Sequence, residues 1–152
     1  MRIAFDLDNT LIPFTSGKQF KVEPRTFVRR IFRAEPLRAG TIALFKSLKA
    51  EGHEIWIYTS SYRPKNFIRR TFFAHGIKLN GIVTQKTHNE VVKIKNIRFS
   101  KYPPSFRMDI LIDDSKGVGM EGEQGGFRTL IIDPEDENWM IRISNEVSKN
   151  EP

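Results

Sequence analysis

The chain has 152 residues, enough for one domain with a good hydrophobic core but short for two. It contains no cysteine, which excludes disulfides and thiolate metal sites and suits the cytoplasm, and it shows neither a membrane-length apolar run nor a signal peptide. Its net charge of +7 favours anionic partners such as phosphate esters, nucleotides or nucleic acid, although surplus lysine and arginine on solvated helix faces would explain it equally well.

The first part of the chain predicts two strands separated by two helices. Ile3–Phe5 is a short apolar run typical of a buried strand. Pro13–Pro24 is mixed and indicates a hairpin or an irregular loop, and Thr26–Ala34 indicates a short basic helix. Apolar residues at helical spacing over Leu37–Leu48 predict the next helix. Glu54–Thr59, rich in β-branched and aromatic residues, predicts the second strand.

The rest of the chain continues this alternation. Helices are predicted at Pro64–Gly76 and Asp136–Val147, and strands at Gly81–Thr84, Met108–Ile112 and Phe127–Ile132. Because strands alternate with helices, we expect a parallel sheet of the α/β class.

Two stretches lack a clear helix or strand pattern. Gln85–Arg107 carries scattered basic residues and gives no readable periodicity. Ser115–Gly126 holds five glycines and is predicted to be a loop. We expect a single domain over residues 1–148 and a frayed tail over 149–152.

Paired acids follow two of the predicted strands. Asp6 and Asp8 come directly after Ile3–Phe5, and Asp113-Asp114 follows Ile110-Leu111-Ile112. Carboxylates at the end of a buried strand are costly unless something uses them, and ligands of open α/β sheets bind at the carboxyl ends of the strands. If the two strands are parallel neighbours, four carboxylates converge, and a divalent cation would hold them together.

These motifs resemble those of the haloacid dehalogenase (HAD) superfamily, whose members are mostly phosphatases that work through an aspartyl-phosphate. Asp6–Thr10 is similar to the first motif, Thr59 at the end of its strand to the second, and Asp113-Asp114 to the fourth. The resemblance implies one Rossmann-like α/β domain with a five-stranded parallel sheet in the order 3-2-1-4-5 and helices on both faces. No segment is long enough for a separate cap domain, so the chain resembles a capless member.

The resemblance also implies a role for each acid. Asp6 would be the nucleophile, and Asp8 would protonate the leaving oxygen and later deprotonate the attacking water. Mg²⁺ would be held by the Asp6 carboxylate, the backbone carbonyl of Asp8, and Asp113, Asp114 or both.

Hydroxyl and basic side chains complete the predicted site. Thr59 would hydrogen-bond a phosphoryl oxygen, and Thr10 would hold the phosphate-binding loop. Ser60 and Arg63, in a segment that departs from most relatives, are candidates for substrate binding, although Arg63 could simply begin the next helix.

The third motif of the family is a lysine, and this sequence offers two candidates. Lys101 lies in a proline-stiffened segment shortly before the strand at Met108–Ile112, and we favour it. Lys86, after the strand at Gly81–Thr84, is the alternative, and each could be an ordinary solvated lysine.

The histidines and one further acid are assigned no function. His53, His75 and His88 lack the spacing of metal ligands and are predicted to lie at the surface or its boundary. Asp133 is predicted to form a cap ahead of Pro134.

The sequence therefore predicts a Mg²⁺-dependent phosphate monoester hydrolase that acts on an anionic substrate, with a nucleotide or a nucleic-acid end as the favoured class. Two alternatives remain. The same residues would serve a phosphotransferase or phosphomutase, and an arginine-rich segment would serve a nucleic-acid-binding module that has kept the fold. That segment carries Arg25, Arg29, Arg30 and Arg33.

Overall fold

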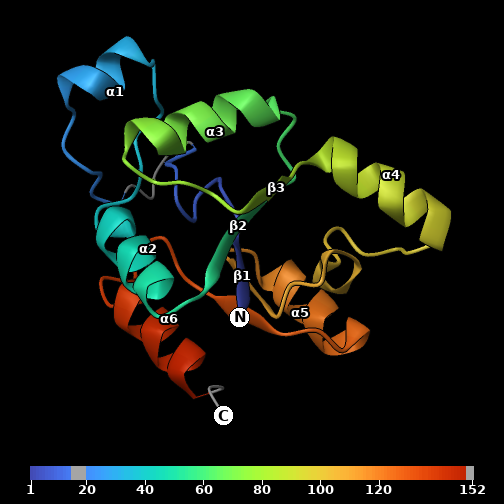
Figure 1. The fold of residues 1–152 in the computed structure, drawn as a ribbon. Helices are drawn as coiled ribbons and strands as arrows, with labels where there is room; N and C mark the ends of the chain where they lie inside the picture. Colours follow the sequence, from blue (N-terminus) through green and yellow to red (C-terminus); the bar gives the residue numbers. More distant parts are fainter. Residues whose placement is uncertain (15–19, 150–152) are drawn as a thin grey trace.

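The computed structural model describes residues 1–14 and 20–149, in which five parallel strands form one sheet in the order β3-β2-β1-β4-β5 (Figure 1). The predicted α/β class and strand order are confirmed. The strands are β1 (Arg2–Phe5), β2 (Glu54–Tyr58), β3 (Gly81–Val83), β4 (Ile110–Asp113) and β5 (Thr129–Ile131).

The register of the sheet brings the carboxyl ends of the three central strands level. Phe5 of β1 lies opposite Ile57 of β2 and Ile112 of β4. The backbone N–H of Asp6 continues the ladder by donating to the carbonyl of Ile112 at 2.8 Å. The residues that follow β1, β2 and β4 therefore meet at one edge of the sheet.

Helices cover both faces of the sheet, as predicted. Alternate side chains of the central strands, such as Ile3 and Phe5, pack in a core with α2 (Thr41–Ala50), α3 (Lys65–Ala74) and α6 (Trp139–Ser148). The intervening side chains pack on the other face with α5 (Lys116–Gly125). Figure 1 shows α2 beside α6, with α5 across the sheet.

The segment predicted to be a loop at Ser115–Gly126 is instead the helix α5, so that prediction was wrong. Its glycines permit close packing against β5. A side chain at Gly122 would come within 2.9 Å of the Phe127 carbonyl, and one at Gly119 within 3.0 Å of Ile131. Only Gly126, with φ of 65°, supplies the left-handed conformation that ends the helix.

The segment without readable periodicity, Gln85–Arg107, contains the helix α4 (Gln85–Lys95) and the 3₁₀ turn η1 (Pro103–Phe106). The predicted basic helix is shorter than expected. It forms α1 over Phe27–Ile31, capped by the Thr26 hydroxyl, and it buries none of its residues.

Some predictions fall on residues outside the described ranges. Residues 15–19 divide the predicted loop at Pro13–Pro24, and residues 150–152 make up most of the predicted tail. Among the helices of the described residues, none is both long and apolar enough to cross a membrane.

Candidate active site

A tight turn after β1 presents the first two acids. The carbonyl of Leu7 accepts hydrogen bonds from the backbone N–H groups of Leu11 at 2.9 Å and Ile12 at 2.8 Å. Asn9 adopts a left-handed conformation with φ of 61°, which asparagine tolerates better than most residues. Because Leu7 and Leu11 are buried, the turn is anchored in the core, and Asp6 and Asp8 are held at its start.

The acids after β4 lie against Asp6. Carboxylate oxygens of Asp6, Asp113 and Asp114 all lie within 4.8 Å of one another. Asp113 accepts a hydrogen bond from the backbone N–H of Ser115 at 2.9 Å, and the Thr10 hydroxyl lies 3.4 Å from Asp114. Three of the four acids that were predicted to converge therefore meet here, whereas the Asp8 carboxylate is paired with Arg63.

Lys101 bridges two of these acids. Its Nζ lies 2.5 Å from Oδ1 of Asp6 and 2.6 Å from Oδ2 of Asp113. All three side chains are buried. The alternative lysine, Lys86, lies exposed on α4 and does not line the pocket at the acids. The structure thus brings Lys101, and not Lys86, to the acidic cluster.

Two neighbouring elements hold the segment that carries Lys101. Glu121 of α5 accepts hydrogen bonds from the backbone N–H of Ser100 at 3.0 Å and from its hydroxyl at 2.7 Å. The backbone N–H of Tyr102 donates to the Tyr58 hydroxyl at 2.8 Å, and that hydroxyl lies 2.6 Å from Nδ1 of His88. Lys101 is therefore fixed from both sides.

Burial controls the ionisation of the cluster. Burial raises the pKa of Asp6 to about 7, against the opposing effect of the Lys101 charge. Burial also raises the pKa of Asp114, and the Asp113 charge adds to this effect. Burial by itself lowers the pKa of Lys101, but the Asp6 and Asp113 charges outweigh it and leave that pKa raised. Three acids thus share one lysine, and the cluster is short of positive charge.

The donor set fits a hard divalent cation. Mg²⁺ prefers carboxylate oxygens, and those of Asp6, Asp113 and Asp114 are already close together and incompletely neutralised. The Asp8 carboxylate is engaged elsewhere, in an ion pair of 2.8 Å with Arg63. A contribution of Asp8 through its backbone carbonyl, as the family resemblance implies, is compatible with that ion pair.

The residues after β2 line another side of the pocket at the acids. Thr59 is buried, and its hydroxyl oxygen accepts a hydrogen bond from the backbone N–H of Ser61 at 3.0 Å. Ser60 is exposed at the rim, and Arg63 reaches across to Asp8. Together with the acids these residues line a pocket of about 530 Å³.

Thr10 does not reach this pocket. Its side chain is fully buried, and its hydroxyl faces Asp114. The structure therefore places Thr10 behind the acids, where it positions Asp114. Its predicted role, which is to hold the loop through its hydroxyl, stays a prediction.

The histidines were predicted at the surface or its boundary, and this was wrong because all three are buried. His53 lies 3.2 Å from the N-terminal amine, His75 bonds the Thr71 carbonyl, and His88 supports Tyr58. Isolated histidines have no periodic pattern that could indicate this burial. Asp133 caps the turn ahead of the last helix, as predicted, by accepting from the backbone N–H of Glu135 at 2.8 Å.

No family model matches the chain, and no curated protein matches its sequence. Among solved structures, the fold is similar to one described as a predicted HAD-like family hydrolase from Porphyromonas gingivalis. The similarity has a TM-score of 0.54 and 15% sequence identity, and it covers 99% of this chain and 98% of that chain. The chain therefore has a HAD-like fold.

Proposed function

We propose that the protein is a Mg²⁺-dependent phosphate monoester hydrolase that works through an aspartyl-phosphate on Asp6. The observation that carries this proposal is the buried cluster in which Lys101 bridges Asp6 and Asp113 at the carboxyl ends of β1 and β4. The HAD-like fold and the description of its structural neighbour as a hydrolase support the same reaction class.

In the proposed reaction an Asp6 carboxylate oxygen attacks phosphorus, and the bond from phosphorus to the ester oxygen breaks. Asp8 gives its proton to the departing oxygen. Asp8 then takes a proton from a water molecule, which attacks the phosphorus of the aspartyl-phosphate, so that inorganic phosphate leaves and Asp6 is regenerated.

The remaining residues neutralise negative charge at the site and orient the phosphoryl group. Lys101 offsets the charge of Asp6 and Asp113 as the phosphoryl group arrives. The Thr59 hydroxyl accepts its bond from Ser61 through oxygen, so its proton stays free for a phosphoryl oxygen. Mg²⁺ held by Asp6, Asp113 and Asp114 would neutralise the equatorial oxygens of that group.

The substrate class follows from the surroundings of the pocket. The helix α1 has five residues, too few for a separate cap domain, which supports our proposal of a capless enzyme open to large substrates. The chain carries a net charge of +7, and Arg30 on α1 and its neighbours Arg25 and Arg33 are exposed, which favours a nucleotide or a phosphorylated nucleic-acid end. A chain without cysteine suits the reducing cytoplasm, where we place the reaction.

The test is hydrolysis of p-nitrophenyl phosphate by the purified protein with Mg²⁺. Asp6→Asn should abolish turnover and acid-stable labelling by a ³²P-labelled substrate, while Glu123→Gln, an exposed acid of α5, should leave both unchanged. Full activity of Asp6→Asn, or of the wild type in excess chelator, would overturn the proposal. Product analysis with an added alcohol acceptor separates hydrolysis from phosphotransfer.

A further inference from the structure

Arg63 is almost fully engaged by other side chains. Its Nη1 lies 2.9 Å from Oδ2 of Asp8 and 2.9 Å from the Ser61 hydroxyl. Its Nε and Nη2 both donate to Oε1 of Glu35, at 3.1 Å and 2.9 Å. One donor at Nε, two at Nη1 and one at Nη2 are thus used, which makes four of the five N–H donors of a guanidinium.

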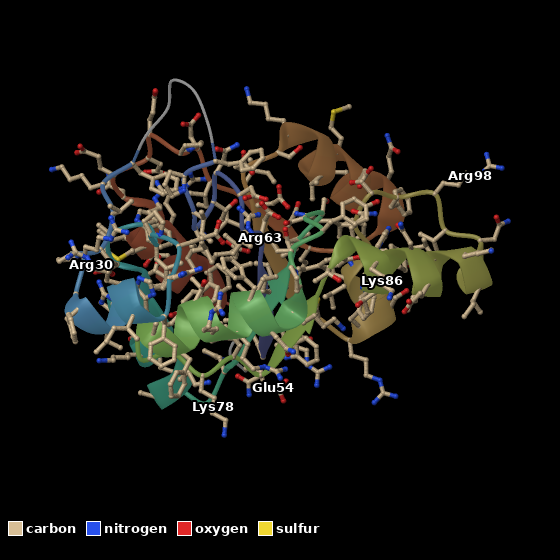
Figure 2. The ribbon with its side chains drawn as sticks, turned by 90° about the horizontal axis from the view of Figure 1, so that it is seen from above. Arg30, Glu54, Arg63, Lys78, Lys86 and Arg98 are labelled. Carbon is tan, nitrogen blue, oxygen red and sulfur yellow. The ribbon has the colours of Figure 1, made fainter. Side chains whose placement is uncertain are left out.

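This geometry suits a clamp better than a free anion site. The guanidinium lies between the carboxyl groups of Asp8 and Glu35, at 2.8 Å and 2.9 Å. The ring of Phe14 also lies against it, 5.8 Å from the guanidinium carbon. In the view of Figure 2, Arg63 lies near the middle of the molecule, whereas Arg30 lies out at the edge on α1.

Glu35 is itself held in place. It belongs to the segment between α1 and α2, and its backbone N–H lies 3.4 Å from the Thr71 hydroxyl of α3. The side chains of Arg63, Asp8 and Glu35 are 18%, 22% and 24% exposed, so all three are partly buried. A chain of partly buried charge pairs therefore runs from residues 27–35, here called the α1 segment, to Asp8 at the pocket.

We propose that Glu35 is a positioning residue: it orients Arg63, which in turn holds the Asp8 carboxyl group where a leaving oxygen can receive its proton. This inference rests on the proposed function. A carboxylate on a turn has rotational freedom, and a proton donor acts only within hydrogen-bond reach, so a fixed guanidinium removes unproductive orientations. Arg63 thereby serves the chemistry through Asp8 and not through substrate binding.

The test compares two phosphate esters. An alkyl phosphate has a poor leaving group that needs protonation, whereas p-nitrophenolate leaves without it. Asp8→Asn should therefore lower kcat/KM far more for the alkyl phosphate than for p-nitrophenyl phosphate. Glu35→Ala should also lose more activity on the alkyl phosphate, but the loss should be smaller than in Asp8→Asn. We expect kcat/KM to fall about tenfold for the alkyl phosphate and less than about twofold for p-nitrophenyl phosphate.

Three further measurements separate positioning from other roles. Glu35→Ala should have no added effect in an Arg63→Ala background, because both act through the same contact. Competitive inhibition by inorganic phosphate should be unchanged in Glu35→Ala. Glu90→Gln, an exposed acid of α4, should change neither substrate. If Glu35→Ala fails to fold, Glu35→Gln keeps the side-chain volume and should show the same selectivity.

The outcomes distinguish the two proposals. Selective loss in Asp8→Asn together with an equal loss on both esters in Glu35→Ala would overturn the positioning role and leave the phosphatase intact. Weaker phosphate inhibition in Glu35→Ala would also overturn it, because Arg63 would then be an anion-binding residue. Absence of leaving-group selectivity in Asp8→Asn would overturn the proposed role of Asp8 and, with it, the positioning role of Glu35, but not hydrolysis through Asp6, which the Asp6→Asn variant tests separately.

Discussion

The acidic cluster and the α1 segment lie on either side of Asp8, and they differ in how they are held. The acids of the cluster lie at the ends of β1 and β4, and Asp6, Asp113 and the bridging Lys101 are 6%, 1% and 4% exposed. The five-residue helix α1 buries no residue, and its apolar side chains Phe27 and Ile31 are 76% and 61% exposed. In the function proposed above, the sheet would fix the reacting groups, while the α1 segment would adjust the orientation of Asp8 and the choice of substrate.

The largest expected effect comes from removing the charge at the centre of the cluster. Lys101→Met keeps the apolar stem but leaves two buried carboxylates without their partner, which costs about 3–5 kcal/mol of unfolding free energy. Turnover should fall by about 10²–10³-fold through lost charge stabilisation. Urea denaturation and steady-state kinetics measure the two effects.

Lys86→Met is the matched control, because that lysine is exposed on α4. It should stay within about 0.5 kcal/mol of wild type and keep its activity. If Lys86→Met lost more activity than Lys101→Met, the lysine of the third motif would be Lys86 and not Lys101.

Metal binding should give the next largest effect. A ligand that binds only the folded state stabilises it, so Mg²⁺ at 100 times its Kd should raise Tm by roughly 5–10 °C. Asp113→Asn should abolish most of this rise, whereas Asp8→Asn should retain it, because the Asp8 carboxylate faces Arg63. Thermal denaturation with and without Mg²⁺ measures the rise in Tm. If Asp113→Asn and Asp8→Asn lost this rise equally, Asp113 would not be the metal ligand that distinguishes it from Asp8.

The sequence predicted those parts of the molecule whose structure follows from residues close together in the chain. Apolar runs identified the strands, and acids at their ends identified the site. Two features escaped because they depend on tertiary contact: the glycines of α5 serve packing against β5, and Glu35 meets Arg63 only after folding. Lys101 was favoured from its place before β4, but only the topology brings its Nζ to the acids.

A smaller effect is expected in the pH dependence of stability, through His75 at the end of α3, the helix that contacts α1. Burial lowers the pKa of His75, which donates to the Thr71 carbonyl and lies near Arg29 and Glu23. The unfolded chain then binds more protons, so the contribution of His75 to stability is full above about pH 6.5 and is lost as pH falls through the lowered pKa.

Comparison of Tm at pH 7.5 and pH 5.5 should therefore show a drop that His75→Gln reduces by a few degrees. His53→Gln, beside the N-terminal amine, provides a control. A pH response identical in wild type and His75→Gln would show that burial at this position carries no proton linkage.

The smallest effect is expected from the exposed arginines of the α1 segment. Arg30 and Arg33 are exposed, whereas Arg29 is partly buried and donates to the Pro24 carbonyl. If the substrate is a phosphorylated nucleic-acid end, each lost phosphate contact should flatten the plot of log kcat/KM against log salt by about 0.7 for a single strand. The double variant Arg30→Ala, Arg33→Ala should flatten that plot for a 5′-phosphorylated oligonucleotide and leave p-nitrophenyl phosphate hydrolysis unchanged. An equally steep salt response in the variant would mean that these arginines only solvate the surface, and the α1 segment would then act on the site through Glu35 alone.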